Sequence, residues 1–576
     1  MHTADTALAD LPRSRFWAWL LVIVALAAAL RLLFPVADPP WQTRVGVVWH
    51  DEGAWAHNAR NRVLFGDWVQ DRWNPMYITP VLTGLEFVSF SLFGVGLWQA
   101  RLVSEIMGIA AVLLLGLSLR RIAGPWAGLF GAALLATAFF TVMYDRAALM
   151  EATMVAFMVA AFAASARADD RPAWALLVGP AALLAYFTKA AAVFLVGAIV
   201  LDSALTLWLT ARGATVDETA RRRRRAAVFT LGGLAVAGLV ALAVFVLPNW
   251  VDYRFYNWQM SVTRKPSYTL RALVDRASWL PVVHDFFTRQ WAVTLLALAG
   301  AFGCLARWRQ ARPSERLLGW WLALGIAELV LHDVGNERRL VFLAPALTGL
   351  AAIVLGGSRQ LLPHAVASLP RRAVLAVSPM VLYGIYVAVG ALGRLPFIYE
   401  IGPGVRWSAA VAAVLGAAVF ATWPAVPRWL ASARWSTAGA ALVVALVAAG
   451  NMAQYAQWAA GRTAKNYAAM KTLGRLLPPG TLVHGKLANG LSLENRIRPV
   501  FVGNGFGNYE DRLDRDDIRY LVTYVTPRLG YEGPVIRDVL DAYPDWHILA
   551  RFDVAESGAG HDQAALIDKG RRAPLR

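Results

Sequence analysis

The chain has 576 residues, of which 58% are hydrophobic, and its formal net charge is +18 at pH 7. The apolar residues fall into long runs, which excludes an ordinary soluble protein and predicts a polytopic membrane protein. The excess arginines lie mainly between these runs, which favours a topology signal and contacts with anionic lipid headgroups over nucleic-acid binding. The single cysteine, Cys304, leaves no disulfide within the chain and no cysteine-based metal site.

The apolar runs define about 13 candidate transmembrane helices, since roughly 20 apolar residues cross the hydrocarbon core of a bilayer. They cover residues 16–36, 99–119, 126–143, 151–166, 173–187, 190–209, 226–248, 291–306, 317–332, 339–357, 373–393, 406–423 and 436–456. We therefore predict an all-α membrane domain over residues 1–456.

The positions of the arginines predict how these helices are oriented, because cytoplasmic loops of membrane proteins are enriched in Lys and Arg. With the N-terminus in the cytoplasm, every even-numbered loop is basic, including the arginine run 221–225. The odd-numbered loops, such as 37–98 and 249–290, carry charges of both signs. The Ala-rich and Arg-rich composition is typical of a GC-rich bacterial source. We therefore expect a bacterial inner (plasma) membrane protein whose C-terminal segment lies on the periplasmic or extracellular side.

Residues 457–576 differ from the rest of the chain, because charged residues become more frequent and the apolar runs shorten to strand length. Strands are predicted at 482–484, 499–502, 518–525 and 546–552, a helix at 535–543, and a candidate last strand at 564–568. This pattern predicts a small extracytoplasmic α/β domain.

The first outside loop, 37–98, contains a polar stretch centred on Asp51 and Glu52. Residues 51–65 have helical spacing, which predicts an amphipathic helix lying on the membrane plane. A carboxylate at the membrane surface can accept a proton from an attacking hydroxyl, so Asp51 and Glu52 are candidate catalytic residues. The alternative is that both residues only cap a helix N-terminus.

Two histidines, His50 and His57, lie near these carboxylates and raise the alternative of a divalent cation beside Asp51. The spacing is not that of an HExxH motif, and nothing in the sequence fixes a ligand geometry. We therefore predict no metal and no cofactor.

A second charged group, formed by Asp145, Arg146 and Glu151, occupies the next predicted outside turn. Ionisable residues at the ends of membrane spans are costly unless they are paired or hydrated, and they are often functional. We expect Glu151 to be catalytic and Asp145 and Arg146 to contact substrate. The alternative is that the three residues pair with one another and only cap two helices.

The remaining outside segments carry cationic side chains. A substrate with a lipid phosphate group would fit such cations. Cations can hold such a phosphate and stabilise it as it leaves. Each cation could instead reach from its helix to the membrane interface without a ligand. The loop 249–290 is also a candidate lid over the donor. The cationic candidates are Lys189, Arg264, Lys265, Arg338 and Arg339.

At these residues the chain resembles the GT-C glycosyltransferases, in particular the branch of protein O-mannosyltransferases and lipid A aminoarabinose transferases. The resemblance covers most of the chain, and its short motifs occur in the order typical of that family. They are the pair Asp51-Glu52, the stretch Pro75 to Pro80 that includes Tyr77, Tyr144 and Arg146 followed by Glu151 where an Asp is usual, the pair Thr188-Lys189, and Arg338-Arg339 ahead of Pro345. One departure is Thr79-Pro80-Val81, where the aminoarabinose branch has a lysine before a proline pair.

The resemblance implies an inverting enzyme that transfers one hexosyl or pentosyl group from a polyprenyl-phosphate carrier to a lipid, glycan or protein outside the cytoplasm. It implies Asp51 as the base and Glu151 as a second acidic residue, with Lys189, Arg338 and Arg339 as contacts to phosphate or acceptor. Tyr77 is a further substrate-binding candidate. The alternatives are a transporter or lipid flippase, which would place ionisable residues at mid-membrane, and a non-catalytic scaffold of envelope assembly.

Overall fold

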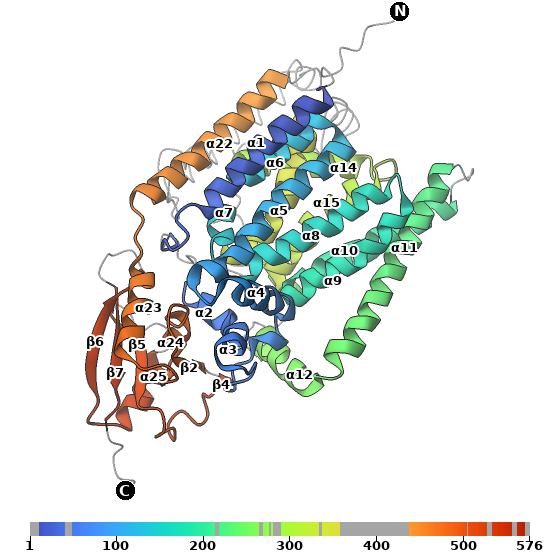
Figure 1. Cartoon of the computed structure of the whole chain (residues 1–576). Helices are drawn as coiled ribbons and strands as arrows, with labels where there is room; N and C mark the ends of the chain where they lie inside the picture. The colour runs from blue at the N-terminus through green and yellow to red at the C-terminus, as the bar shows by residue number, and fades with distance from the viewer. Residues whose placement is uncertain are drawn as a thin grey trace, which may run out of the picture.

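The protein is described here by a computed structural model, in which a body of long helices carries a smaller α/β unit at one end (Figure 1). Two predicted spans, 373–393 and 406–423, lie outside the described residues. The description covers the chain except for residues 1–10, 41–48, 213–217, 264–268, 276–277, 280–289, 333–336, 357–436, 504, 527–532, 556–561 and 571–576.

The helical body is built from apolar helices, with α5 packed against both α6 and α8, and α14 packed against α17. Its first part comprises α1 (Arg13–Leu32), α4 (Pro80–Phe93), α5 (Leu97–Ala123), α6 (Pro125–Thr137), α7 (Phe139–Asp145), α8 (Met150–Ala168), α9 (Val178–Thr188) and α10 (Val193–Arg212). Its second part comprises α11 (Glu218–Ala241), α12 (Trp250–Trp258), α14 (Trp291–Ala306), α15 (Pro313–His332), α16 (Glu337–Leu340), α17 (Ala344–Gly356) and α22 (Thr437–Ala460).

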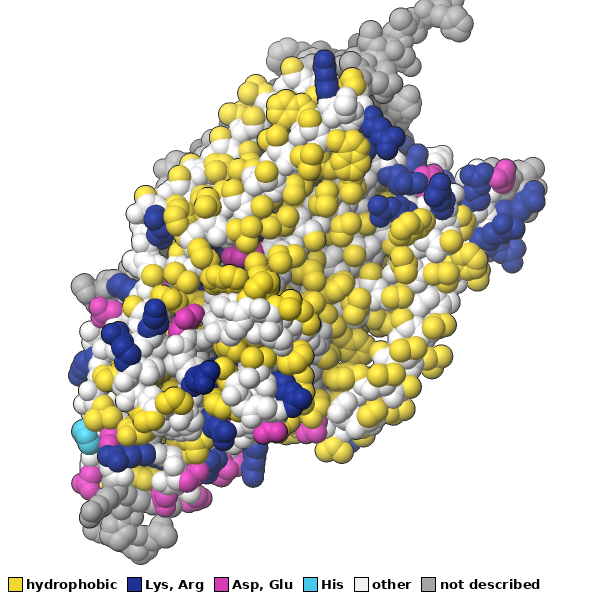
Figure 2. All heavy atoms as spheres, in the orientation of Figure 1, with side chains coloured by type: hydrophobic (Ala, Val, Ile, Leu, Met, Phe, Trp, Pro, Cys, Tyr) yellow, Lys and Arg dark blue, Asp and Glu magenta, His cyan; other side chains and the backbone are white. Residues whose placement is uncertain are grey.

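Several of these helices have the length and surface of membrane spans. Within the described residues, six helices are long and apolar enough to cross a bilayer, or seven if α6 and α7, which meet at a bend of 64°, form one span. Large apolar side chains such as Leu21 and Leu239, each 65% exposed, cover the outside of the body, as Figure 2 shows. A soluble monomer rarely exposes so large an apolar surface to water, whereas the acyl chains of a bilayer would cover it. The chain is therefore a multi-pass membrane protein.

The predicted spans within the described residues each coincide with one helix or with two or three helices in direct succession. The total of about 13 stays a prediction. The structure adds α4, an apolar helix of 14 residues within the predicted loop 37–98.

The α/β unit contains a five-stranded sheet in the order β2-β1-β5-β7-β6. Strand β1 runs parallel to β2 and β5, and β7 runs antiparallel to β5 and β6. Each predicted strand of this region is present, as is the predicted helix. The elements are α23 (Lys465–Leu476), β1 (Leu482–His484), α24 (Lys486–Gly490), β2 (Arg498–Val500), β3 (Val502–Gly503), β4 (Phe506–Gly507), β5 (Tyr520–Thr526), α25 (Gly533–Asp541), β6 (His547–Asp553) and β7 (Gln563–Asp568).

The first outside loop is packed directly against the α/β unit. Its two short helices, α2 (Asp51–Trp55) and α3 (His57–Phe65), replace the single amphipathic helix expected on the membrane plane, and most of their residues are buried. Arg60, which is fully buried, donates hydrogen bonds of 2.9–3.1 Å to carbonyl oxygens in the segment 492–497. A Cβ atom on Gly53 would lie 1.9 Å from the carbonyl oxygen of Asn489, so the two backbones are in direct contact. This contact positions α24 beside Asp51.

Candidate active site

Asp51 begins α2 with its carboxylate held between two cations. Its Oδ2 accepts a hydrogen bond from Nη1 of Arg338 at 2.7 Å, and its Oδ1 lies 2.8 Å from Nζ of Lys486. The side chain is 14% exposed, so a small group can still reach the carboxylate. Both carboxylate oxygens thus face cationic partners, and capping of a helix N-terminus does not account for this residue.

Arg338, at the start of the helix pair α16–α17, connects Asp51 to the second acidic residue. Its Nε donates a hydrogen bond to Oε1 of Glu151 at 2.5 Å. The same oxygen accepts a second hydrogen bond from Nζ of Lys189, also at 2.5 Å. Glu151 lies in the first turn of α8, and Lys189 lies directly after α9. Four residues that the sequence analysis selected therefore meet in one cluster, although they come from separate segments of the chain.

The cluster contains three cations, Arg338, Lys189 and Lys486, and two carboxylates, Asp51 and Glu151, so its net charge is +1 with all five groups ionised. Burial alone would raise the pKa of Asp51, but the charges of Lys486 and Arg338 outweigh burial and hold the pKa well below its ordinary value. Asp51 is thus a carboxylate at neutral pH. A surplus of positive charge at the same place suits an anionic group such as a phosphate.

Glu52 lies next to Asp51 in the sequence but faces a different part of the protein. It is fully buried and forms a two-pronged ion pair with Arg101 of α5, with N–O distances of 2.7 and 2.8 Å. Its Oε1 also accepts the backbone N–H of Ala148 at 2.9 Å. Glu52 was expected to be catalytic, whereas this arrangement ties α2 to α5 and to the turn before α8.

Asp145 and Arg146 also lie apart from the Asp51 cluster, and their partners are on α1. Asp145 forms a buried ion pair of 2.8 Å with Arg31, near the end of that helix. The Arg146 guanidinium donates to the carbonyl oxygens of Leu30 and Arg31, which the end of α1 leaves without helical partners, and to that of Phe34 just beyond the helix. The expectation that both residues contact substrate is not supported by these contacts, and nor is mutual pairing within the turn.

Three further predicted contacts could not be placed in the cluster. The side chains of Arg264, Lys265 and Arg339 lie outside the described residues. Tyr77, in the short helix η1 (Pro75–Tyr77), is only partly buried and stacks on Tyr256 of α12 with ring centroids 5.8 Å apart.

Lys486, which the α/β unit contributes to the cluster, is not among the residues predicted from the sequence. It is the first residue of α24 and follows β1 almost directly. That position after a predicted strand was the one available signal, since loops at strand ends often carry functional residues. His50 is also held by this unit, because its Nδ1 lies 3.2 Å from the hydroxyl of Tyr524. Among the residues that the structure describes, no group of three or more His, Cys, Asp and Glu side chains is arranged to hold a metal ion.

Comparison with known proteins identifies the fold. Residues 79–250 match the family of dolichyl-phosphate-mannose-protein mannosyltransferases. No curated protein matches the chain in sequence. The crystal structure of ArnT from Cupriavidus metallidurans in the apo state is similar, with a TM-score of 0.54 and 17% identity over 96% of this chain and 98% of that chain. The chain has the GT-C glycosyltransferase fold.

The resemblance to GT-C glycosyltransferases that the sequence indicates is thereby confirmed. Two other solved structures match with TM-scores under 0.5. ArnT from Cupriavidus metallidurans bound to undecaprenyl phosphate has a TM-score of 0.45 and 18% identity over 96% of this chain and 97% of that one. The archaeal oligosaccharyltransferase AglB from Archaeoglobus fulgidus, in complex with an inhibitory peptide and a dolichol-phosphate, has a TM-score of 0.48 and 12% identity over 88% of this chain and 69% of that one.

Proposed function

We propose that this protein is an integral-membrane glycosyltransferase that moves one sugar from a polyprenyl-phosphate donor to an acceptor outside the cytoplasm. The observation that carries the proposal is the Asp51 carboxylate held between Arg338 and Lys486, with Arg338 also bound to Glu151. This cluster joins a proton acceptor to a surplus of cations, on a fold that glycosyltransferases share. A transporter or lipid flippase is not favoured, because the charged groups gather at helix ends beside the α/β unit instead of at mid-membrane.

In the proposed reaction Asp51 accepts the proton of the acceptor hydroxyl as its oxygen attacks the anomeric carbon of the sugar. The bond from that carbon to the phosphate oxygen breaks, and polyprenyl phosphate leaves with the electron pair. Arg338, Lys189 and Lys486 are the groups that would stabilise the negative charge on the leaving phosphate. A single displacement of this kind inverts the configuration at the anomeric carbon.

The low pKa of Asp51 fits this sequence of events. A carboxylate that two cations hold is a weak base, because the same charges that lower its pKa also oppose its protonation. A donor phosphate would compete with Asp51 for Arg338 and Lys486. Binding of the donor would then raise the basicity of Asp51, so that the base becomes effective only when substrate is present.

The orientation in the membrane is part of the proposal. The arginine run on α11 lies at the end of the helical body that is opposite to the α/β unit (Figures 1 and 2). If the basic end faces the cytoplasm of a bacterial cell, the cluster around Asp51 and the α/β unit face the periplasmic or extracellular side of the inner membrane.

The proposal is tested with purified protein in liposomes and a set of radiolabelled polyprenyl-phosphate sugars. We expect label to move to a lipid, glycan or protein acceptor, or to water as slow donor hydrolysis when no acceptor is present. Inversion is checked by determining the anomeric configuration of the product. Movement of the intact donor across the bilayer, without cleavage of its sugar–phosphate bond, would instead establish a flippase.

Replacing Lys486 with glutamine should move the acid limb of the pH–activity profile to higher pH. Among the neighbouring charges, that of Lys486 lowers the pKa of Asp51 the most, so removing it raises that pKa. A carboxyl group with a higher pKa becomes protonated earlier as the pH falls, and activity is then lost at a higher pH. The measurement is kcat/KM for transfer between pH 2.5 and 8, a range that extends below the ordinary pKa of an aspartate, with Lys471→Gln on the exposed side of α23 as the matched control. An acid limb at the same pH in both variants would contradict a role for Lys486 at Asp51.

A further inference from the structure

A groove at the end of the helical body opposite to Asp51 combines arginines with apolar walls. It has a volume of about 290 Å³, close to the lower end of the range of roughly 300–1,000 Å³ for small-molecule sites. Arg120 and Arg121 come from the end of α5 and Arg167 from the end of α8. Leu117 and Trp17 line the groove from α5 and α1. In Figure 2, Lys and Arg side chains gather at this end of the molecule.

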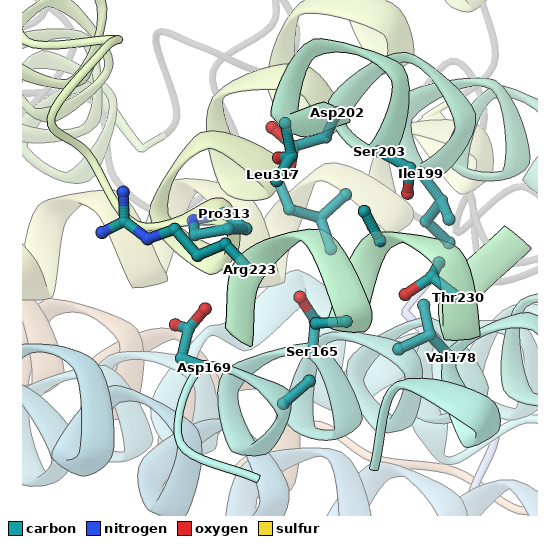
Figure 3. Close-up of a pocket in the computed structure, with 14 residues that line it drawn as sticks. Ser165, Asp169, Val178, Ile199, Asp202, Ser203, Arg223, Thr230, Pro313 and Leu317 are labelled. Atoms are coloured by element: carbon teal, nitrogen blue, oxygen red, sulfur yellow. The ribbon is translucent and has the colours of Figure 1, made fainter. Parts of the chain in front are cut away.

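A second cavity at this end, among the described residues, is too small for an organic ligand. It lies between α8, α10, α11 and α15 and has a volume of about 40 Å³ (Figure 3). One water needs roughly 10–15 Å³ by this measure, so only a few waters fit. Its acidic residues already have partners: Asp202 pairs with Arg316 at 2.7 Å, and Asp169 accepts a hydrogen bond from Ser314.

The arginines of the groove are held in place mainly by aromatic rings, which do not cancel their charge. The Arg120 guanidinium lies 4.2 Å from the ring centroid of Phe16, and that of Arg167 lies 4.9 Å from the ring of Trp174. Arg121 pairs with Asp170 at 2.8 Å, but these side chains are 38% and 56% exposed, and such surface pairs contribute only about 0–1 kcal/mol. Three cations against one carboxylate leave a charge of +2 around the groove.

The position of the groove at the membrane surface favours a lipid as its ligand. Helices α1, α5 and α8 are each long and apolar enough to span a bilayer, so their basic ends lie at the level of the headgroups. Trp17, 37% exposed, occupies the interfacial position that tryptophan favours in membrane proteins. One turn further along α1, Leu21 is 65% exposed and extends the apolar surface toward the hydrocarbon.

We propose that this groove binds an anionic glycerophospholipid. Its phosphate lies among Arg120, Arg121 and Arg167, where guanidinium groups can each donate two hydrogen bonds. Its acyl chains run along the apolar surface of α1 and α5. Basic pockets between transmembrane helices on the cytoplasmic side are a known form of anionic-lipid site. A lipid bound here would join α1 to α5 and α8 at the end distant from the reaction.

The test uses the full-length protein in a neutral detergent, with phosphatidylglycerol, phosphatidylethanolamine or inorganic phosphate added. We expect phosphatidylglycerol to raise the thermal unfolding midpoint by several degrees, and the other two to leave it unchanged. A phosphate effect equal to that of phosphatidylglycerol would overturn the assignment to a lipid. Native mass spectrometry of the wild-type protein in an equimolar mixture of the two lipids gives an independent measurement. Equal retention of the two lipids would also overturn the proposal.

The variant Arg121→Gln/Arg167→Gln should retain about tenfold less phosphatidylglycerol and lose the thermal shift. The matched control is Arg222→Gln/Arg224→Gln, which removes the same charge from exposed positions of α11 at the same end of the molecule. It should keep both responses. If the two double variants lose lipid equally, binding follows overall charge and the groove is not a site.

Discussion

Replacing Asp51 with asparagine is expected to lower kcat for sugar transfer by a factor of about 10²–10⁴, the usual contribution of a positioned general base. Asparagine keeps the size of the side chain but cannot accept the proton of the incoming hydroxyl. The protein should stay folded, because Arg338 retains its contact with Glu151 at 2.5 Å and Asp51 is 14% exposed. Transfer is measured in liposomes, and folding by the thermal unfolding midpoint.

Measuring the affinity for the donor distinguishes a general base from a residue that binds the donor. Asp51 competes with a phosphate for Arg338 and Lys486, so its neutral replacement should bind polyprenyl phosphate as tightly as the wild-type protein, or more tightly. Asp67→Asn, an exposed change in the same loop, is the control and should leave both measurements unchanged. Asp51 would not be the base if the Asp51→Asn variant kept more than about a tenth of the wild-type kcat.

The sequence could identify much of this cluster because charge at the end of a membrane span is costly. Glu151, Lys189 and Arg338 each interrupt or border an apolar run, and such residues need a partner, water or a ligand. The sequence shows the need for a partner without showing which partner meets it. Asp145 has the same pattern as Glu151, yet it pairs with Arg31 of α1 and lies outside the cluster.

Lys486 could not be placed from the sequence, because its contact with Asp51 depends on how the α/β unit docks. That docking involves close backbone contact, as between Gly53 and Asn489, and carbonyl oxygens that any residue type would supply to Arg60. Neither feature leaves a distinctive residue pattern. By contrast, short runs of β-branched and aromatic residues predict the strands of this unit, and such runs can be recognised from a few consecutive residues.

In the helices, too, some features can be predicted from neighbouring residues, whereas others depend on residues distant in sequence. Apolar length locates the spans, whereas the break between α6 and α7 falls at Ala138, a residue with no intrinsic tendency to end a helix. The N–H of Phe139 that follows this break points to the side chain of Asn451 on α22, at 3.4 Å. Because the bend involves a partner distant in sequence, the region 126–143 is predicted as one straight span.

The largest stability effect is expected at the pair Glu52–Arg101. The two side chains are 1% and 3% exposed, and both oxygens of Glu52 are engaged by Arg101. Replacing Glu52 with glutamine removes the carboxylate that is directly bonded to the buried guanidinium, and breaking a buried pair in this way typically costs about 3–5 kcal/mol. It also weakens the hydrogen bond from the N–H of Ala148 to Oε1, so the turn before α8 is held less firmly to α2. We expect a lower thermal unfolding midpoint and a smaller yield of folded protein.

This variant also decides between the two roles considered for Glu52. If the residue holds α2 in place, the remaining folded Glu52→Gln protein turns over at close to the wild-type rate per active molecule, in contrast to Asp51→Asn. The double variant Glu52→Gln/Arg101→Met removes both members of the pair and should recover part of the lost stability, because the guanidinium that lost its carboxylate is then absent. Asp517→Asn is the control, since its pair with Arg515 is exposed and should contribute no more than about 1 kcal/mol. A loss of turnover at unchanged stability would instead return Glu52 to the catalytic role that its sequence position indicates.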